Sequence, residues 1–181
     1  DAALAAAIAL TVVEPTMNGI GSDAFAIVWD KDRLHGLNAS GRSPAAWNHD
    51  HFSRYASMPQ LGWDAVTVPG AVSAWAELSG RFGKLPFQDL FGPAIGYAHN
   101  GFLVPPIIAQ SWKNAETAYP DFPDFGATFL PNGTAPEAGE RFECKAQART
   151  LERIAETGGE AFYRGDLADR IVACAKTAGG L

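Results

Sequence analysis

Apart from a short extended segment at 65–68, only two segments of this 181-residue chain have the pattern of β-strands, and this scarcity limits its possible folds. Residues 25–29 form an apolar, strand-forming run, residues 30–32 form a polar turn, and residues 33–38 return as a second strand. We expect the first strand to be buried. Two strands alone do not make a stable sheet. The other strands must therefore come from elsewhere, and we expect the chain to be a fragment of a larger protein.

Most of the remaining sequence has helical character. The Ala-rich segment 1–13 is expected to be a buried helix, and 71–82 carries apolar residues at helical spacing. Further helices are expected at 47–55, 87–99, 106–119, 144–157 and 166–176. The proline-rich segment 119–139 is expected to be a surface loop held down by its aromatic side chains. A helix, a hairpin and then several helices predict an α+β fold, with residues 1–181 as a single domain whose helices cover a sheet.

The composition excludes several classes of protein. The formal net charge is -6 and no cluster of Lys and Arg occurs, which argues against a nucleic-acid surface. No apolar run reaches the roughly 18 residues of a membrane span. Cys144 and Cys174 are too few for a disulfide scaffold. Packed free thiols are the favoured interpretation, a disulfide is the alternative, and the compartment stays open.

Known chemical motifs are absent or misplaced. The spacing Gly19-x-Gly21-x-x-Ala24 resembles a dinucleotide fingerprint, but that motif needs a strand before it and a helix after it, whereas the order here is reversed. A tight turn fits better. His49 and His51 could present two imidazoles, but a metal site needs three or four convergent ligands. The sequence contains no Gly-x-Ser-x-Gly nucleophile elbow. We therefore expect no metal and no cofactor.

Four polar residues flank apolar segments and are candidate site residues: Glu14, Asp23, Arg42 and Asp64. Arg42 stands out because it directly follows the second strand, where loop residues often bind ligands. A guanidinium there could hold a carboxylate through two hydrogen bonds. The structural alternative for Arg42 is an ion pair that orders the loop.

A series of segments, in order along nearly the whole chain, resembles the larger subunit of the γ-glutamyltransferases. The matching segments are Asp1-Ala2-Ala3 through Val13-Glu14-Pro15, Gly19-Ile20-Gly21, Val68-Pro69-Gly70-Ala71-Val72, Phe82-Gly83-Lys84-Leu85, Pro93-Ala94-Ile95 and Phe162-Tyr163-Arg164-Gly165. The resemblance implies an N-terminal-nucleophile hydrolase with an αββα sandwich, of which this chain forms an incomplete part. It also implies self-cleavage, which exposes a nucleophilic Thr at the start of a smaller subunit. We therefore assign no catalytic residue to this chain, and its partner is the small subunit.

In the family, the larger subunit contributes an Arg that binds the α-carboxylate of a γ-glutamyl substrate. The family loop reads Arg-Glu, two residues and Pro. Counting back from Pro44 places the family's Arg position at Ser40, whereas the Arg of this chain is Arg42. Ser40 and Arg42 are therefore the candidate substrate-binding residues. Because of this departure, a glutaryl acylase acting on side-chain amides is the alternative to a γ-glutamyl enzyme. A helical protein-binding module without chemistry is the alternative from another class.

Overall fold

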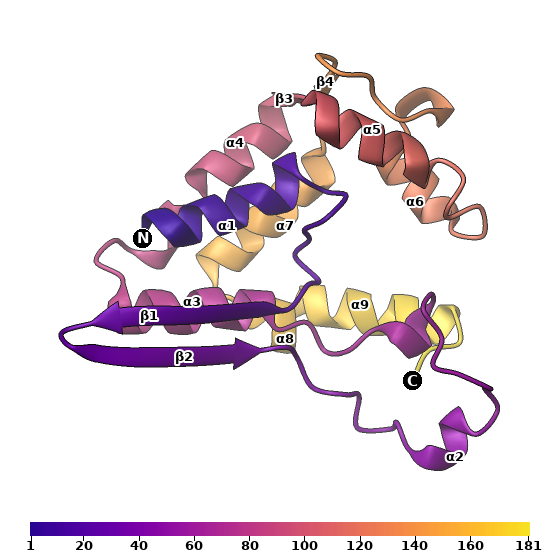
Figure 1. The fold of residues 1–181 in the computed structure, drawn as a ribbon, viewed down its shortest axis with the longest axis horizontal. Coiled ribbons are helices and arrows are strands. Elements are labelled where there is room, and N and C mark those ends of the chain that lie inside the picture. Colours follow the sequence, from indigo (N-terminus) through magenta and orange to yellow (C-terminus); the bar gives the residue numbers. More distant parts are fainter.

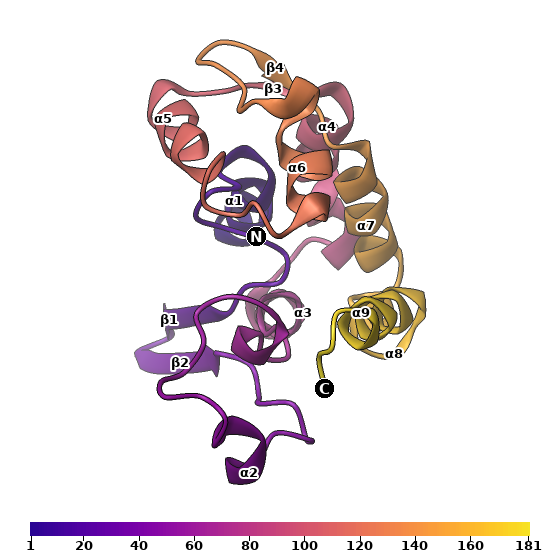
Figure 2. The ribbon, with the colours of Figure 1, turned by 90° about the vertical axis from the view of Figure 1, so that its right-hand side faces the viewer.

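The computed structural model describes residues 1–181 as two tiers of secondary structure (Figures 1 and 2). The upper tier packs α1 (Ala2–Val13) against α4 (Gly92–Asn100), which in turn packs against α7 (Lys145–Glu156). The lower tier contains the hairpin β1 (Ala24–Asp30) and β2 (Arg33–Ala39), with α3 (Ala71–Phe82) lying along it. This arrangement confirms the expected order of helix, hairpin and helices.

The remaining elements are short, apart from two longer helices. They are α2 (His49–Phe52), η1 (Trp63–Ala65), η2 (Phe87–Phe91), β3 (Phe102–Leu103), α5 (Pro106–Ala115), α6 (Pro123–Phe129), η3 (Pro131–Gly133), β4 (Arg141–Phe142), α8 (Glu160–Arg164) and α9 (Asp166–Thr177), where η denotes a 3-10 helix. None of the helices is long and apolar enough to cross a bilayer.

The hairpin turn is one residue shorter than the polar turn expected at 30–32, because Asp30 belongs to β1 and pairs with Arg33. The antiparallel register runs from Ala24 opposite Ala39 to Asp30 opposite Arg33. Lys31 and Asp32 form the turn, and both have positive φ, at 46° and 65°. Two positive φ values in a two-residue loop are typical of the turn whose twist matches that of the flanking strands.

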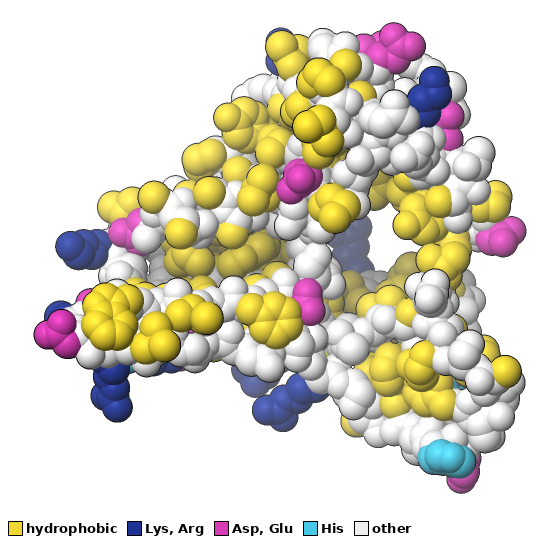
Figure 3. Space-filling view, in the orientation of Figure 1, with side chains coloured by type: hydrophobic (Ala, Val, Ile, Leu, Met, Phe, Trp, Pro, Cys, Tyr) yellow, Lys and Arg dark blue, Asp and Glu magenta, His cyan; other side chains and the backbone are white.

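The prediction that the first strand is buried was wrong. Phe25, Ile27 and Trp29 are 65%, 78% and 67% exposed, and Figure 3 shows hydrophobic side chains along this face of the hairpin. Successive side chains of a strand point to opposite faces, and only the other face, which carries Ala26 and Val28, lies against α3. An apolar strand is buried only where something covers it, and no element of this chain covers this face.

The core lies mainly in the upper tier. Ala94, Ala98 and Ala148 are fully buried where α4 meets its neighbours. Small side chains let the helix backbones approach closely, and the apolar face of α7 adds Leu151 and Ile154, which are also fully buried. The Ala-rich helix α1 buries only one face, of Ile8, Thr11 and Val12, rather than being buried throughout.

Several expected boundaries were wrong. The helix expected at 47–55 is only four residues long, and the helix expected at 87–99 begins as η2 before α4 starts at Gly92. The helix expected at 106–119 ends at Ala115, and residues 116–118 form turns before Tyr119-Pro120, where a helix could not continue. The expected surface loop 119–139 contains the helix α6.

Aromatic side chains do hold this segment down, as expected. Trp112 of α5 donates its indole N–H to the Phe129 carbonyl oxygen at 2.8 Å, and the two rings meet edge to face. The cysteines are both free, but only Cys144 is buried, whereas Cys174 is exposed on α9. The expectation of packed thiols therefore holds for one of the two.

Candidate functional site

An open groove of about 630 Å³ lies where β2 ends and α3 begins. Its walls come from the end of β2 and the following loop (residues 37–42), from residues 68–70, from the first two turns of α3, and from Tyr163 of α8. Both predicted binding residues, Ser40 and Arg42, line it. The two predicted residues lie on one loop, and the structure brings this loop together with two other parts of the chain, residues 68–77 and Tyr163.

Two glycines allow the groove to form. Gly41 has a φ of 79°, and a Cβ atom there would lie 2.0 Å from the Val68 carbonyl oxygen. A Cβ atom on Gly70 would lie 1.9 Å from the Ala39 carbonyl oxygen. Only glycine permits such close backbone contact at these two positions. The Val68 N–H donates to the Arg42 carbonyl oxygen at 2.8 Å and fixes the two segments side by side.

The start of α3 is held from two sides. The amides of Gly70 and Ala71 both donate to the Ser22 carbonyl oxygen, at 3.2 and 2.9 Å. The Tyr163 hydroxyl donates to the Pro69 carbonyl oxygen at 2.8 Å and accepts from the Ser73 amide at 2.9 Å. Tyr163 thus satisfies an amide of the first helical turn that has no partner within the helix. Sequence reasoning missed this role, although Tyr163 lies in a segment that carries the resemblance.

The Arg42 side chain is exposed and forms neither an ion pair nor a hydrogen bond within the chain. The structural alternative, an ion pair that orders the loop, has no partner here. The Ser40 amide donates to the Asn38 side-chain oxygen at 3.0 Å, which stabilises the turn at the end of β2. The acidic side chain in the groove wall, Glu77, lies 3.6 Å from Arg81 on its own helix. The Arg42 guanidinium is therefore available to an anionic ligand.

The other three candidates lie outside the groove. Glu14 accepts a hydrogen bond from the Asn18 side chain, which braces the turn after α1. Asp23 precedes β1 and makes no ion pair. Asp64 is buried, and its carboxylate is the acceptor in a polar cluster with three residues from the α2 region.

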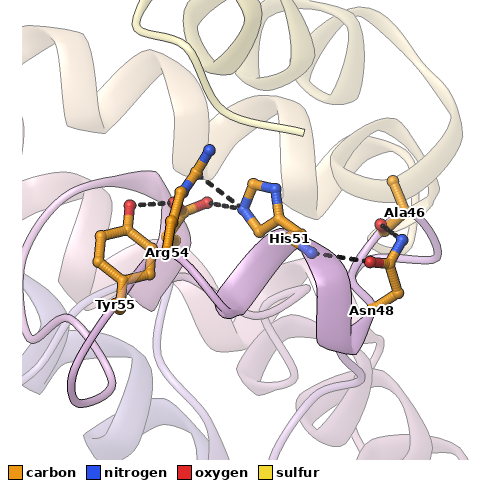
Figure 4. Close-up of polar contacts among 6 residues, drawn as sticks. Ala46, Asn48, His51, Arg54 and Tyr55 are labelled. Atoms are coloured by element: carbon orange, nitrogen blue, oxygen red, sulfur yellow. Dashed lines mark hydrogen bonds and ion pairs between the residues drawn. The ribbon is translucent and has the colours of Figure 1, made fainter.

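Figure 4 shows His51, Arg54 and Tyr55 converging in this cluster. The Tyr55 hydroxyl lies 2.6 Å from Asp64 Oδ2, His51 Nε2 lies 2.8 Å from Asp64 Oδ1, and the Arg54 guanidinium bonds Oδ2. The hydrogen bonds from Tyr55, His51 and Arg54 hold the pKa of the Asp64 carboxyl well below its usual range. His51 is thus engaged with Asp64, and no group of three or more potential metal ligands occurs in the chain.

A second hollow, of about 440 Å³, lies in the upper tier. Four of its seven lining residues are hydrophobic, and its one charged side chain, Arg141, donates to the Asn100 carbonyl oxygen at 3.1 Å. Its one charged side chain is thus bound to the backbone, whereas the Arg42 guanidinium has no partner in the chain, so the groove beside Arg42 is the better candidate site.

The groove can bind an anion, but its own residues do not form a catalytic set. Its hydroxyl groups belong to Ser40, Ser73 and Tyr163, and no histidine lines it. The Ser73 hydroxyl donates to the Gly70 carbonyl oxygen at 2.7 Å. A serine nucleophile needs an adjacent base within hydrogen-bond reach, and no such pair occurs here. This arrangement fits a binding role for the groove.

Comparisons with known proteins agree over the whole length of the chain. The family profile described as Gamma-glutamyltranspeptidase matches residues 1–181. The Glutathione hydrolase-like YwrD proenzyme of Bacillus subtilis is 38% identical over 178 residues, which are 95% of this chain and 33% of that protein.

Two solved structures superpose closely. The cephalosporin acylase from Bacillus halodurans gives a TM-score of 0.94 at 46% identity, over 99% of this chain and 35% of that chain. The Helicobacter pylori gamma-glutamyltranspeptidase gives a TM-score of 0.94 at 26% identity, over 99% of this chain and 54% of that chain. The chain spans about a third of the length of the curated relatives it matches.

Proposed function

The chain belongs to the gamma-glutamyltranspeptidase family, and we propose that it supplies the carboxylate-binding side of the acyl site in an amide-cleaving enzyme. The family's fold is the αββα sandwich of N-terminal-nucleophile hydrolases, and residues 1–181 correspond to part of its larger subunit. The alternative of a helical binding module without chemistry loses its support, because this is a family of enzymes.

The observation that carries the proposal is the free guanidinium of Arg42 in the groove. A planar guanidinium matches a carboxylate through two parallel hydrogen bonds. The acidic side chain of the same groove, Glu77, has Arg81 beside it, so Arg42 is not neutralised from within the chain. Ser40, two residues earlier, adds a hydroxyl at the position of the family's Arg. We propose that these two side chains hold the carboxylate of the acyl group.

The bond-breaking group comes from outside these residues, because the groove contains no paired nucleophile and base. In the proposed reaction, the hydroxyl of an N-terminal Thr on the small subunit attacks the amide carbonyl carbon, and its own α-amine takes the hydroxyl proton. The C–N bond then breaks, and the leaving amine receives that proton. The resulting acyl ester is cleaved by water, which gives the acid, or by an amine, which gives a new amide.

The exposed face of β1 supports a partner of this kind. Phe25, Ile27 and Trp29 form a continuous apolar row on a two-stranded sheet. Burying such side chains contributes about 1.5–3 kcal/mol each, and leaving three together in water is unfavourable. We propose that the second β-layer of the sandwich, which includes the small subunit, packs on this face.

Two classes of acyl group are compatible with this site, γ-glutamyl and glutaryl. The 46% identity to a cephalosporin acylase, together with Ser40 in place of the family's Arg, supports a glutaryl acylase as the alternative to a γ-glutamyl enzyme. A glutaryl group ends in a carboxylate but lacks the α-amino group. Both acyl groups offer a carboxylate to Arg42, so the proposed site accommodates either substrate class.

Two measurements on the complete gene product test this function. A denaturing gel should show two polypeptides after maturation, because the proposed enzyme cleaves itself. The purified protein should then release the chromophore from γ-glutamyl or glutaryl p-nitroanilide, and the ratio of the two rates identifies the class. A single intact polypeptide that releases neither would overturn the proposal.

A further inference from the structure

A closed loop connects Arg42 to the opposite wall of the groove. Residues 43–67 leave the groove, form α2 and η1, and return at Val68. The two ends meet at the hydrogen bond between the Val68 N–H and the Arg42 carbonyl oxygen, at 2.8 Å. Whatever orders this loop therefore also fixes the backbone from which the Arg42 side chain extends.

The loop has almost no hydrophobic core of its own. Within residues 43–67 Asp64 is the one buried residue. The edge-to-face contact between Trp47 and Phe52, with ring centroids 5.0 Å apart, lies on the α2 side and does not join α2 to η1. Ordering a backbone costs roughly 1–2 kcal/mol per residue. Few apolar contacts are present to offset that cost, so the polar cluster around Asp64 has to contribute.

We propose that Asp64 is a positioning residue for Arg42: its carboxylate closes the loop 43–67 and thereby holds Arg42 in the groove. The inference rests on the proposed function of Arg42. The donors His51, Arg54 and Tyr55 lie on the outgoing arm of the loop, whereas the acceptor lies on η1 of the returning arm. This cluster is the polar connection between the two arms.

Short, braced segments connect the cluster to the groove. On the returning arm, three residues separate Asp64 from Val68, and the Val66 N–H donates to the Trp63 carbonyl oxygen at 3.1 Å. On the outgoing arm, the Trp47 N–H donates to the Pro44 carbonyl oxygen at 3.0 Å. The Asn48 side chain accepts from the His51 amide at 2.9 Å and caps α2. These hydrogen bonds brace the backbone on both sides of the cluster.

A carboxylate is needed at the centre of this cluster. An ionised carboxylate only accepts hydrogen bonds, so the 2.8 Å contact from His51 Nε2 is a hydrogen bond when that nitrogen carries the ring proton. In that tautomer Arg54, which also lies 2.9 Å from Nε2, donates to Asp64 and not to His51. Tyr55 and Arg54 donate to the second oxygen. Asparagine would replace one carboxylate oxygen with an NH₂ group. Because NH₂ donates hydrogen bonds, it would face at least one of the three donors without accepting from it. Asp64→Asn should therefore loosen the loop without changing the volume of the side chain.

The test uses the complete, matured enzyme and two kinds of acyl donor. One kind carries a carboxylate (glutaryl or γ-glutamyl p-nitroanilide), and the other, pentanoyl p-nitroanilide, does not. Asp64→Asn should raise KM for the carboxylate donor about tenfold, within the range by which small misplacements impair a site, and leave KM for pentanoyl p-nitroanilide unchanged. Asp64→Asn added to Arg42→Ala should raise KM no further, because the effect acts through Arg42.

Two further variants complete the test. Asp166→Asn removes an exposed carboxylate that accepts from Arg153 at 3.0 Å outside the groove, and it should leave both values of KM unchanged. Tyr55→Phe removes one hydrogen bond to Asp64 but keeps the Asp64 carboxylate. It should therefore raise KM for the acyl donor that carries a carboxylate by about threefold, less than Asp64→Asn does. It serves as the test if Asp64→Asn does not fold.

The outcomes separate this inference from the proposed function. An equal rise in KM for both acyl donors would show that Asp64 acts on folding in general and would overturn the inference. A further tenfold rise in KM when Asp64→Asn is added to Arg42→Ala would have the same meaning. An unchanged KM in both Asp64→Asn and Tyr55→Phe would do the same while leaving the proposed function intact. A parent enzyme that turns over none of the three anilides would overturn the proposed function itself, and this inference with it.

Discussion

The carbonyl oxygen of Arg42 accepts a hydrogen bond from the amide of Val68 at 2.8 Å. This bond joins the loop after β2 to the segment that leads into α3. The groove thus has two walls that are far apart in sequence but held together through the backbone. The positions of Gly41 and Gly70 against the opposing carbonyl oxygens show how little space separates them.

The close contact at Gly70 predicts opposite effects of alanine at two glycines. Gly70→Ala should lower the free energy of unfolding by about 1–3 kcal/mol, because its Cβ would lie 1.9 Å from the Ala39 carbonyl oxygen. Gly80→Ala, on the exposed face of α3 with no atom within 4 Å, should raise it by up to about 1 kcal/mol. Chemical denaturation of the complete protein measures both, and equal effects would contradict the packing described here.

The exposed face of β1 predicts a difference between two exposed isoleucines. Ile27 on β1 and Ile107 on α5 are 78% and 80% exposed. Ile27→Asp should sharply lower the yield of matured two-chain enzyme, because it places a charge in the proposed sheet interface. Ile107→Asp should change stability by no more than about 0.5 kcal/mol, as is usual for surface substitutions. Similar yields of the two variants would exclude this face as the interface.

The Asp64 cluster predicts a specific pH dependence of stability. Its hydrogen bonds hold the pKa of Asp64 below the usual range, whereas the unfolded chain titrates near about 3.9. The unfolded chain therefore binds the proton more readily, and the stabilisation is full above about pH 5 and is lost as the pH falls below about 4. The difference in Tm between the parent enzyme and Asp64→Asn should be larger at pH 5 than at pH 3. A difference that is equal or larger at pH 3 would contradict this account.

Local sequence patterns predicted much of the fold correctly. The hairpin follows from strand-forming residues on both sides of a polar turn. The helices α3, α7 and α9 follow from apolar periodicity, and their observed ends lie within about two residues of those expected. Arg42 was predicted because it follows a strand, and Ser40 because the resemblance places the family's Arg position there; both line the groove.

The features that sequence analysis missed depend on distant parts of the chain. The exposure of Ile27 depends on what covers the hairpin, and no pattern within β1 encodes that. The helix α6 lies in a proline-rich segment and is stabilised by contacts with Trp112. Asp64 and His51 were considered separately, because they lie 13 positions apart in the sequence. Tyr163 reaches Pro69 across 94 positions, which only the fold reveals.

The most direct test of the central claim is the effect of Arg42→Ala on two acyl donors in the complete enzyme. Losing a charged hydrogen-bond partner costs about 1.5–3 kcal/mol, so kcat/KM for glutaryl or γ-glutamyl p-nitroanilide should fall about 10- to 100-fold. The value for pentanoyl p-nitroanilide should stay unchanged, as should both values in Arg33→Ala, which removes an arginine outside the groove. If Arg42→Ala leaves the carboxylate donors unaffected, or impairs pentanoyl p-nitroanilide equally, Arg42 does not bind the acyl carboxylate.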